Sequence, residues 1–138
     1  MGRRRQAREI ALQALYIMDT AKTPEDEAFK IVNRREEPGD ESTVNFAREL
    51  VSGTTSGRKD IDKEIEATAE NWTVARMAAV DRNVLRLAAF ELMHRTDTPV
   101  NVVIDEAIEI VRKFSTEEST RFVNGILDKL KDQRPKGK

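Results

Sequence analysis

The sequence has no cysteine and only one histidine, and these two shortages exclude several kinds of chemistry. Without cysteine the chain forms no disulfide and offers no thiolate nucleophile. With His94 as the single histidine and with no cysteine, we expect neither a zinc site nor a Cys- or His-based catalytic triad. We interpret His94 as a structural side chain near the end of a helix. The lack of cysteine is compatible with a cytoplasmic protein, which is the location we expect.

Glycine-rich phosphate-binding motifs and long apolar runs are also missing. Neither Gly-x-x-x-x-Gly-Lys nor Gly-x-Gly-x-x-Gly occurs, so no phosphate-binding loop of these types is present. No apolar run approaches the roughly 20 residues of a membrane-spanning helix. The charged start MGRRRQAREI is not followed by an apolar segment, so we expect no signal peptide and no membrane contact.

Acidic residues are numerous, but their pattern does not favour a catalytic or metal site. Asp105, Glu106 and Glu109 lie among lysines and arginines on what we expect to be the solvated face of a helix. We therefore expect no catalytic residue, no metal and no cofactor. The remaining class is a binding protein rather than an enzyme.

Charge is distributed unevenly, although the net charge of the 138 residues is only −1. Residues 1–8 carry four arginines and no acid, and residues 129–138 also carry a net charge of +4. The intervening residues 9–128 therefore have a net charge of −9. Basic ends suit an anionic partner and an acidic body suits a basic one, although solvated chain ends are often basic without such a role.

Hydrophobic periodicity predicts an all-α fold of about seven helices in one domain. We expect two small helical lobes, about 1–57 and 58–132, followed by a mobile basic tail at 133–138. The weak helix formers of Gly53–Gly57 mark the boundary between the lobes, although the helix could run through part of this stretch. A charged loop with a Pro-Gly break, residues 34–40, separates the second helix from the third. The helices should begin near Arg3, Thr23, Ser42, Arg58, Asp81, Pro99 and Ser115.

The stretch from Trp72 to Leu92 should organise the fold, because its helix is apolar over most of its circumference. Such a helix has to be covered by others on nearly every side. We expect Trp72 to brace its entry turn, and we expect a core centred on four residues of this helix: Val84, Leu87, Ala88 and Leu92.

The last two helices carry specific expectations. PVNVVI could form a short strand, but no second strand is available to pair with it, so we predict a helix there. Ser115 and Glu118 have the spacing of a capping box, with Ser115 as the cap. Gly125 lies inside the last helix, where glycine is costly, and we expect a neighbouring helix to approach it closely.

The most specific local feature is the arginine cluster at the start of the first helix. Arg3, Arg4, Arg5 and Arg8 should lie clear of the apolar stripe. Positive charges oppose the helix dipole at this end, so the arrangement costs some stability and hints at a use. The planar guanidinium fork suits phosphate. Tyr16 also lies off the apolar stripe, which predicts that it is exposed.

Three stretches, taken in order, resemble the NusB family of transcription antitermination factors. They are RRRQAREIALQALY at 3–16, WTVARMAAVDRNVLRLAAFEL at 72–92, and PVNVVIDEAIEIVRKFSTEESTRFVNGILDKL at 99–130. The resemblance covers almost the whole chain. It implies a two-lobed helical fold without catalytic activity. It also implies binding of the single-stranded boxA element of ribosomal RNA leader transcripts together with NusE, a protein of the small ribosomal subunit. Other Nus factors and RNA polymerase are the further partners implied, and a homodimer is possible.

The resemblance also implies roles for particular residues. The RNA-binding positions it implies are Arg3, Arg4, Arg5, Gln6, Arg8 and Phe122. The partner-binding positions it implies are Tyr16, Asp81 and Glu118. Structural roles remain open for three of these residues: Glu118 as a cap, Phe122 as a packing residue, and Asp81 as a partner of the helix dipole.

Three other protein classes share features with this sequence. The helical domain also resembles the N-terminal part of some RNA cytosine methyltransferases, but those need a separate catalytic domain with cysteines. A helix-turn-helix DNA-binding protein would use the arginines on phosphates, yet the acidic body offers no basic recognition helix. A purely protein-binding adaptor is the third. Binding to single-stranded RNA, to duplex DNA or to neither separates RNA binding from the last two.

Overall fold

The computed structural model describes residues 2–35 and 40–135, and these residues form seven α-helices, two short 3₁₀ helices and no strand. This confirms the all-α prediction, including a helix where PVNVVI could have formed a strand. The elements are α1 (Arg3–Thr20), α2 (Glu25–Arg35), α3 (Glu41–Ser56), α4 (Arg58–Ala69), η1 (Val74–Arg76), α5 (Ala79–His94), α6 (Val100–Phe114), α7 (Glu117–Leu130) and η2 (Lys131–Gln133).

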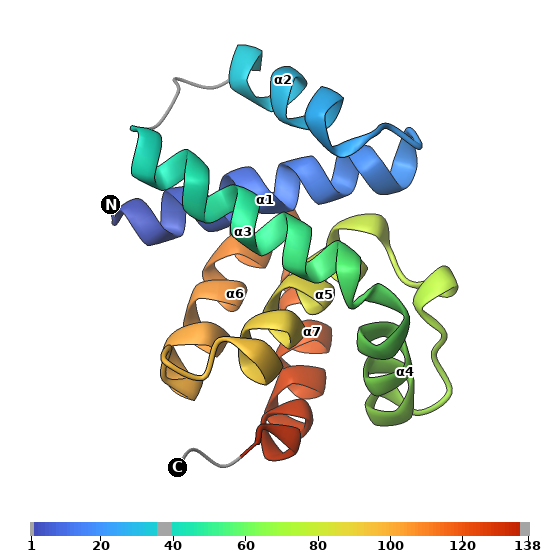
Figure 1. Cartoon of the computed structure of the whole chain (residues 1–138). Coiled ribbons are helices and arrows are strands. Elements are labelled where there is room, and N and C mark those ends of the chain that lie inside the picture. The colour runs from blue at the N-terminus through green and yellow to red at the C-terminus, as the bar shows by residue number, and fades with distance from the viewer. Residues whose placement is uncertain (1, 36–39, 136–138) are drawn as a thin grey trace.

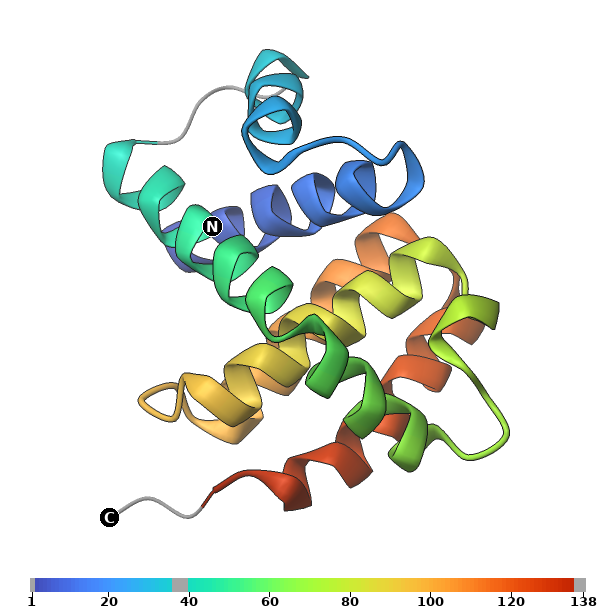
Figure 2. The same cartoon turned by 45° about the vertical axis from the view of Figure 1, so that its right-hand side comes forward.

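The helices form two groups, which Figures 1 and 2 show from two sides. Helices α1, α2 and α3 lie together, with α2 on the outside of α1, and helices α4 to α7 lie beneath them. Each group has its own apolar cluster. The clusters interlock, because Leu87 of α5 belongs to the cluster of α1–α3, whereas Leu12 of α1 belongs to that of α4–α7.

Helix α5 is the central element, as its all-round apolar pattern predicts. It contacts α1, α3, α4, α6 and α7. The four residues expected at the core are buried: Val84, Leu87, Ala88 and Leu92. The helix begins only at Ala79, however, and Trp72 is 42% exposed instead of bracing its first turn.

The junction between the two groups falls at Gly57. Helix α3 runs through Gly53 to Ser56, and α4 begins at Arg58. Gly53 is required by close packing, because a Cβ atom there would overlap the Phe90 ring of α5. The glycine-rich stretch therefore includes both a helical crossing point and the break that follows it.

The structure corrects two details of the last helix. Thr116, not Ser115, is the N-cap of α7, and its hydroxyl accepts a hydrogen bond from the Ser119 N–H at 3.0 Å. A Cβ atom at Gly125 would meet no atom within 4 Å outside its own helix and chain neighbours, so the expected close approach of another helix is wrong.

The chain end and the loop after α2 are described only in part. Arg134 donates to the carbonyl oxygens of Glu91, Leu92 and Arg95, and so covers the C-terminal end of α5. The beginning of the tail predicted at 133–138 is thus attached, while residues 136–138 lie outside the described residues. Most of the predicted charged loop, residues 36–39, also lies outside them. No helix of the described residues is long and apolar enough to cross a membrane.

Candidate nucleic-acid interface

The first turn of α1 combines two exposed arginines with free backbone donors. Gly2 is the N-cap and supplies no side chain to the first N–H groups, and the turn contains no acidic residue. Arg3 and Arg4 are exposed. Arg3 makes one long ion pair, 3.3 Å from its Nε to an oxygen of Asp40, and its side chain is 77% exposed. Unsatisfied N–H groups and the positive end of the helix dipole favour an anion here.

The first two arginines border a pocket of about 350 Å³ between α1 and α3. The Arg4 guanidinium lies 3.9 Å from the centre of the Phe46 ring. Arg95, from the end of α5, lies 5.2 Å from the centre of the same ring. No sequence pattern points to Arg95, because its approach to α1 depends on how α5 crosses α3. The pocket also contains one acid, Glu49, 3.5 Å from Arg95.

Arg5 is only half-exposed and already has a partner. Its Nε and Nη2 atoms donate to the two carboxylate oxygens of Glu106 at 3.0 and 2.6 Å. The hydrogen bond to Glu106 raises the pKa of Arg5, and the same bond lowers the pKa of Glu106. Gln6, also half-exposed, makes no side-chain hydrogen bond with any other described residue. Both remain within reach of a ligand at the surface, with Arg5 less free than Arg3.

Arg8 is buried, so the prediction that it lies clear of the apolar stripe is wrong. It is 4% exposed, and its Nε and Nη2 atoms donate to the two oxygens of Glu91 on α5, both at 2.8 Å. Burial alone lowers the pKa of Arg8, but the hydrogen bond and the charge of Glu91 outweigh it and raise the pKa. The ion pair ties α1 to the central helix, and it separates Arg8 from the exposed arginines of the motif.

A shallow hollow of about 970 Å³ lies between α6 and α7, beside the start of α1. Three arginines border it: Arg5, Arg112 and Arg121. Arg112 and Arg121 are paired with acids of their own helices, at 2.7 Å to Glu109 and 3.8 Å to Glu117. The lining also includes three acids, so this hollow carries no excess of positive charge, unlike the pocket bordered by Arg3, Arg4 and Arg95.

The exposed tyrosine predicted on α1 is exposed and forms part of an apolar groove. Tyr16 is 41% exposed. The groove has a volume of about 230 Å³ and is formed by Leu12, Gln13, Tyr16, Ile17, Val80 and Phe114. We call it the Tyr16 groove. Phe114 at its edge is 37% exposed, so two aromatic rings face solvent beside aliphatic side chains.

Of the two acidic residues assigned to a partner, one is buried. Asp81 is 5% exposed and accepts hydrogen bonds from the hydroxyls of Ser119 at 2.9 Å and Ser115 at 3.4 Å. It joins the first turn of α5 to the start of α7, so its side chain is not presented to a partner at the surface. Glu118 is exposed and makes no ion pair with another described residue.

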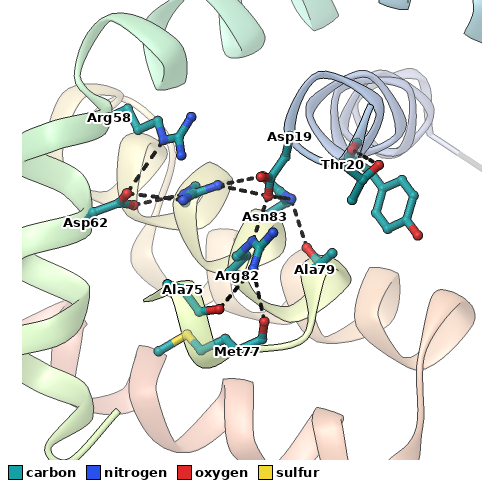
Figure 3. A network of polar contacts seen from close by, with 11 residues as sticks. Asp19, Thr20, Arg58, Asp62, Ala75, Met77, Ala79, Arg82 and Asn83 are labelled. Carbon is teal, nitrogen blue, oxygen red and sulfur yellow. Dashed lines mark hydrogen bonds and ion pairs between the residues drawn. The ribbon is translucent and has the colours of Figure 1, made fainter. Parts of the chain in front are cut away.

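A network of charged residues joins the far end of α1 to α4 and α5 (Figure 3). Asp19 accepts hydrogen bonds from Arg82 Nε at 2.6 Å, Asn83 Nδ2 at 2.9 Å and Arg86 Nη1 at 3.2 Å. Arg86 also donates to both oxygens of Asp62 on α4. Burial alone raises the pKa of Asp19, but the bonds from Arg82 and Asn83 outweigh it and lower the pKa to about 2. We call these five residues the Asp19 network.

Among residues 2–35 and 40–135, no group of three or more histidine, aspartate and glutamate side chains is placed to hold a metal ion. The surfaces described above instead have the chemistry of recognition: a basic helix start on one part of α1 and an apolar groove on another. The fold and these surfaces define a helical binding protein. Residues 5–132 match the model of the NusB family. The chain belongs to this family of transcription antitermination proteins.

Individual relatives agree with this family over nearly the full length. The transcription antitermination protein NusB of Anaeromyxobacter dehalogenans is 49% identical over 134 residues, which is 97% of this chain and 94% of that protein. The NusB structure of T. maritima is 36% identical, has a TM-score of 0.87, and matches 96% of this chain and 93% of its own. A structure of antitermination factors NusB and NusE in complex with double-stranded RNA is 27% identical, with a TM-score of 0.88 and coverage of 95% and 97%.

Proposed function

We propose that this protein is a non-catalytic, cytoplasmic RNA-binding factor that binds single-stranded boxA RNA of ribosomal leader transcripts together with NusE. The observation that carries the proposal is the uncapped start of α1 with its exposed Arg3 and Arg4. Family membership supports RNA binding together with NusE, because a solved relative contains NusB, NusE and double-stranded RNA. The complex then acts with other Nus factors on RNA polymerase.

The four arginines of the motif have different roles in this proposal. Arg3 and Arg4 contact phosphates directly, helped by the free N–H groups of the same helical turn. Arg5 contributes less, because Glu106 already occupies two of its donors. Arg8 acts indirectly, since its buried pair with Glu91 holds α1 against α5. Gln6 and Phe122 remain candidate contacts to bases.

The RNA contact predicts a specific salt dependence. Replacing Arg3 and Arg4 together by alanine removes two phosphate contacts. The slope of log K against log salt for single-stranded RNA should therefore fall in magnitude by about 1.4, since each contact contributes about 0.7. Fluorescence anisotropy with a labelled boxA RNA between low and physiological salt measures the slope. Binding of unrelated single-stranded RNA should weaken as well, because phosphates carry no sequence information.

A matched control removes the same charge elsewhere. Lys59 and Lys63 are exposed on α4, and changing both to alanine should leave the salt slope within experimental error of the unmodified protein. Equal slopes for the Arg3/Arg4 variant and the unmodified protein would exclude these arginines from the interface. Tighter binding of duplex DNA than of boxA RNA would instead favour the helix-turn-helix interpretation.

We propose the Tyr16 groove as the docking surface for NusE. A protein surface with two partly exposed aromatic rings suits a protein partner, because buried aromatic side chains dominate interface energies. The groove lies on the middle of α1, away from the basic first turn, so RNA and NusE can bind together. Glu118, exposed at the start of α7, is a further candidate for contact with a basic partner.

The groove predicts that Tyr16→Ala weakens NusE binding by about fivefold or more, because loss of an aromatic residue that dominates an interface costs more than about 1 kcal/mol. Isothermal titration calorimetry with purified NusE measures the change. Val102→Ala is the control, since Val102 is 39% exposed but lies outside the groove, and its NusE affinity should change less than twofold. An unchanged affinity for Tyr16→Ala would place the NusE surface elsewhere.

A further inference from the structure

An exposed aromatic cluster lies outside the basic helix start and the Tyr16 groove. It consists of Trp72, from the loop between α4 and α5, with Phe122 of α7 and Arg76 of η1. The rings of Trp72 and Phe122 meet edge to face, with centroids 5.4 Å apart. The Arg76 guanidinium lies 5.3 Å from the centre of the Trp72 ring. We call these three residues the Trp72 platform.

The indole of Trp72 is exposed although two neighbours hold its orientation. It is 42% exposed, the largest value among the exposed large hydrophobic residues of the described chain. Phe122 is half-buried and packs against the apolar cluster of α4–α7, so the ring that contacts Trp72 is itself anchored. The Trp72 ring is large and apolar, and the anchored Phe122 ring keeps it in contact with solvent. It is therefore accessible to a ligand and is not part of the core.

The backbone before Trp72 is strained. Glu70 and Asn71 have φ angles of 36° and 63°, values that are uncommon for side chains other than glycine. The following turn is held by Glu66, whose carboxylate accepts a hydrogen bond of 2.7 Å from the Val74 N–H. Strain of this kind persists only where surrounding contacts determine the conformation, and it gathers at functional surfaces. Here it turns the chain so that Trp72 faces outward beside α7.

Charge and position indicate an RNA base as the ligand. Arg76 is exposed and makes no ion pair with another described residue, so its charge is free to attract an anion beside the ring. Phe122 adjoins Arg121 in α7, and Arg121 borders the hollow that also contains Arg5 of the basic helix start, although three acids line this hollow beside its three arginines. This proximity gives a strand bound at α1 a short path past Arg5 and Arg121 and over α7 to Trp72, where Arg76 supplies a positive charge that is unpaired among the described residues. Aromatic rings beside basic side chains are the usual means of binding single-stranded nucleic acid.

We propose that Trp72 stacks against one base of the single-stranded RNA, with Phe122 orienting the indole and Arg76 contacting the adjacent phosphate. This inference rests on the proposed RNA-binding function and adds a residue to it. Phe122, which the family resemblance suggests as an RNA contact, then acts at least partly through Trp72. From the sequence alone, Trp72 is expected only to pack at the entry to the central helix.

The chain contains one tryptophan, so its fluorescence reports on this position alone. We expect labelled boxA RNA to bind, by anisotropy, and to quench Trp72 emission over the same concentration range. Trp72→Ala should weaken RNA binding by about 5- to 150-fold, the effect of losing one stacked base. Trp72→Phe retains a stacking surface and should recover most of the affinity. Circular dichroism and the melting temperature verify that each variant is folded.

The possible outcomes separate this inference from the proposed function. RNA binding without quenching, and with unchanged affinity in Trp72→Ala, overturns the platform while leaving RNA binding intact. Unchanged RNA affinity with a loss of NusE binding in Trp72→Ala also overturns it and assigns the ring to a protein contact. Failure of the unmodified protein, with and without NusE, to bind any single-stranded RNA overturns both proposals. If Trp72→Phe binds RNA no more tightly than a folded Trp72→Ala variant, stacking of a base on this ring is ruled out.

Discussion

Replacing Arg8 with alanine is expected to lower the free energy of unfolding by about 3–5 kcal/mol, the cost of breaking a buried ion pair from one side. The substitution leaves the carboxylate of Glu91, which is 2% exposed, without its main partner. Helix α1 would lose a principal attachment to α5. Urea unfolding followed by circular dichroism measures the effect. The slope of the unfolding free energy against urea concentration should remain similar if the folded and unfolded states keep their compactness.

Two further variants separate the buried charge from the loss of an arginine as such. Arg3→Ala removes an exposed arginine of the same helix and should change stability by less than about 0.5 kcal/mol. Combining Arg8→Met with Glu91→Leu replaces both charges by apolar groups and should recover much of the loss, because neither partner is then left unpaired. A loss below 1 kcal/mol in Arg8→Ala would show that the pair contributes little. Substituting Arg8 is consequently a poor test of RNA contact, since it destabilises the folded protein.

The Asp19 network should give the second large effect, and one that depends on pH. Asp19→Ala removes the acceptor shared by Arg82, Asn83 and Arg86, and at pH 7 this should cost about 3–5 kcal/mol. Asp19 has a pKa of about 2 in the folded protein, below its usual 3.8. The unfolded chain therefore binds the proton more readily, and the stabilisation is complete above pH 3.8 and lost as the pH falls through 2.

The difference in stability between the unmodified protein and Asp19→Ala should consequently shrink by about 2 kcal/mol between pH 5 and pH 2. Urea unfolding of both proteins at several pH values gives this difference directly. Taking the difference also cancels the contributions of other carboxyl groups, such as Asp40, whose pKa is likewise lowered to about 2. If this difference stays constant across the pH range, the arginine neighbours do not lower the pKa of Asp19.

Local patterns predicted the helices well and their charged contacts poorly. The apolar period of α5 correctly indicated a helix covered on most sides, because burial of that many apolar side chains has one efficient solution. The start of α7 was misplaced by one residue, since both Ser115 and Thr116 are good caps and only the backbone path selects between them. The weak helix formers at 53–57 indicate a boundary without showing where the helix stops, and only the fold shows that Gly53 is helical and packs against the ring of Phe90.

The candidate site shows the same division. The exposure of Arg3, Arg4 and Tyr16 follows from their place on α1. Whether the other candidate site residues are exposed or buried depends on how α5, α6 and α7 pack around them. Arg8 lies beside the apolar stripe. It is buried in the folded protein, where it pairs with the carboxylate of Glu91, 83 positions away in sequence. Asp81 is likewise buried, and it accepts hydrogen bonds from the hydroxyls of Ser115 and Ser119 near the start of α7.

By itself the sequence determined the all-α class, the number of helices, the central position of α5, and the family, because these depend on residue order and on periodicity within single segments. Tertiary structure alone decided which arginines and which acids form ion pairs with each other. It also decided that Trp72 faces solvent beside Phe122 and Arg76. The physical reason is that a charge or a ring is free or occupied according to its neighbours in space. Those neighbours come from distant segments, which meet only when the helices cross.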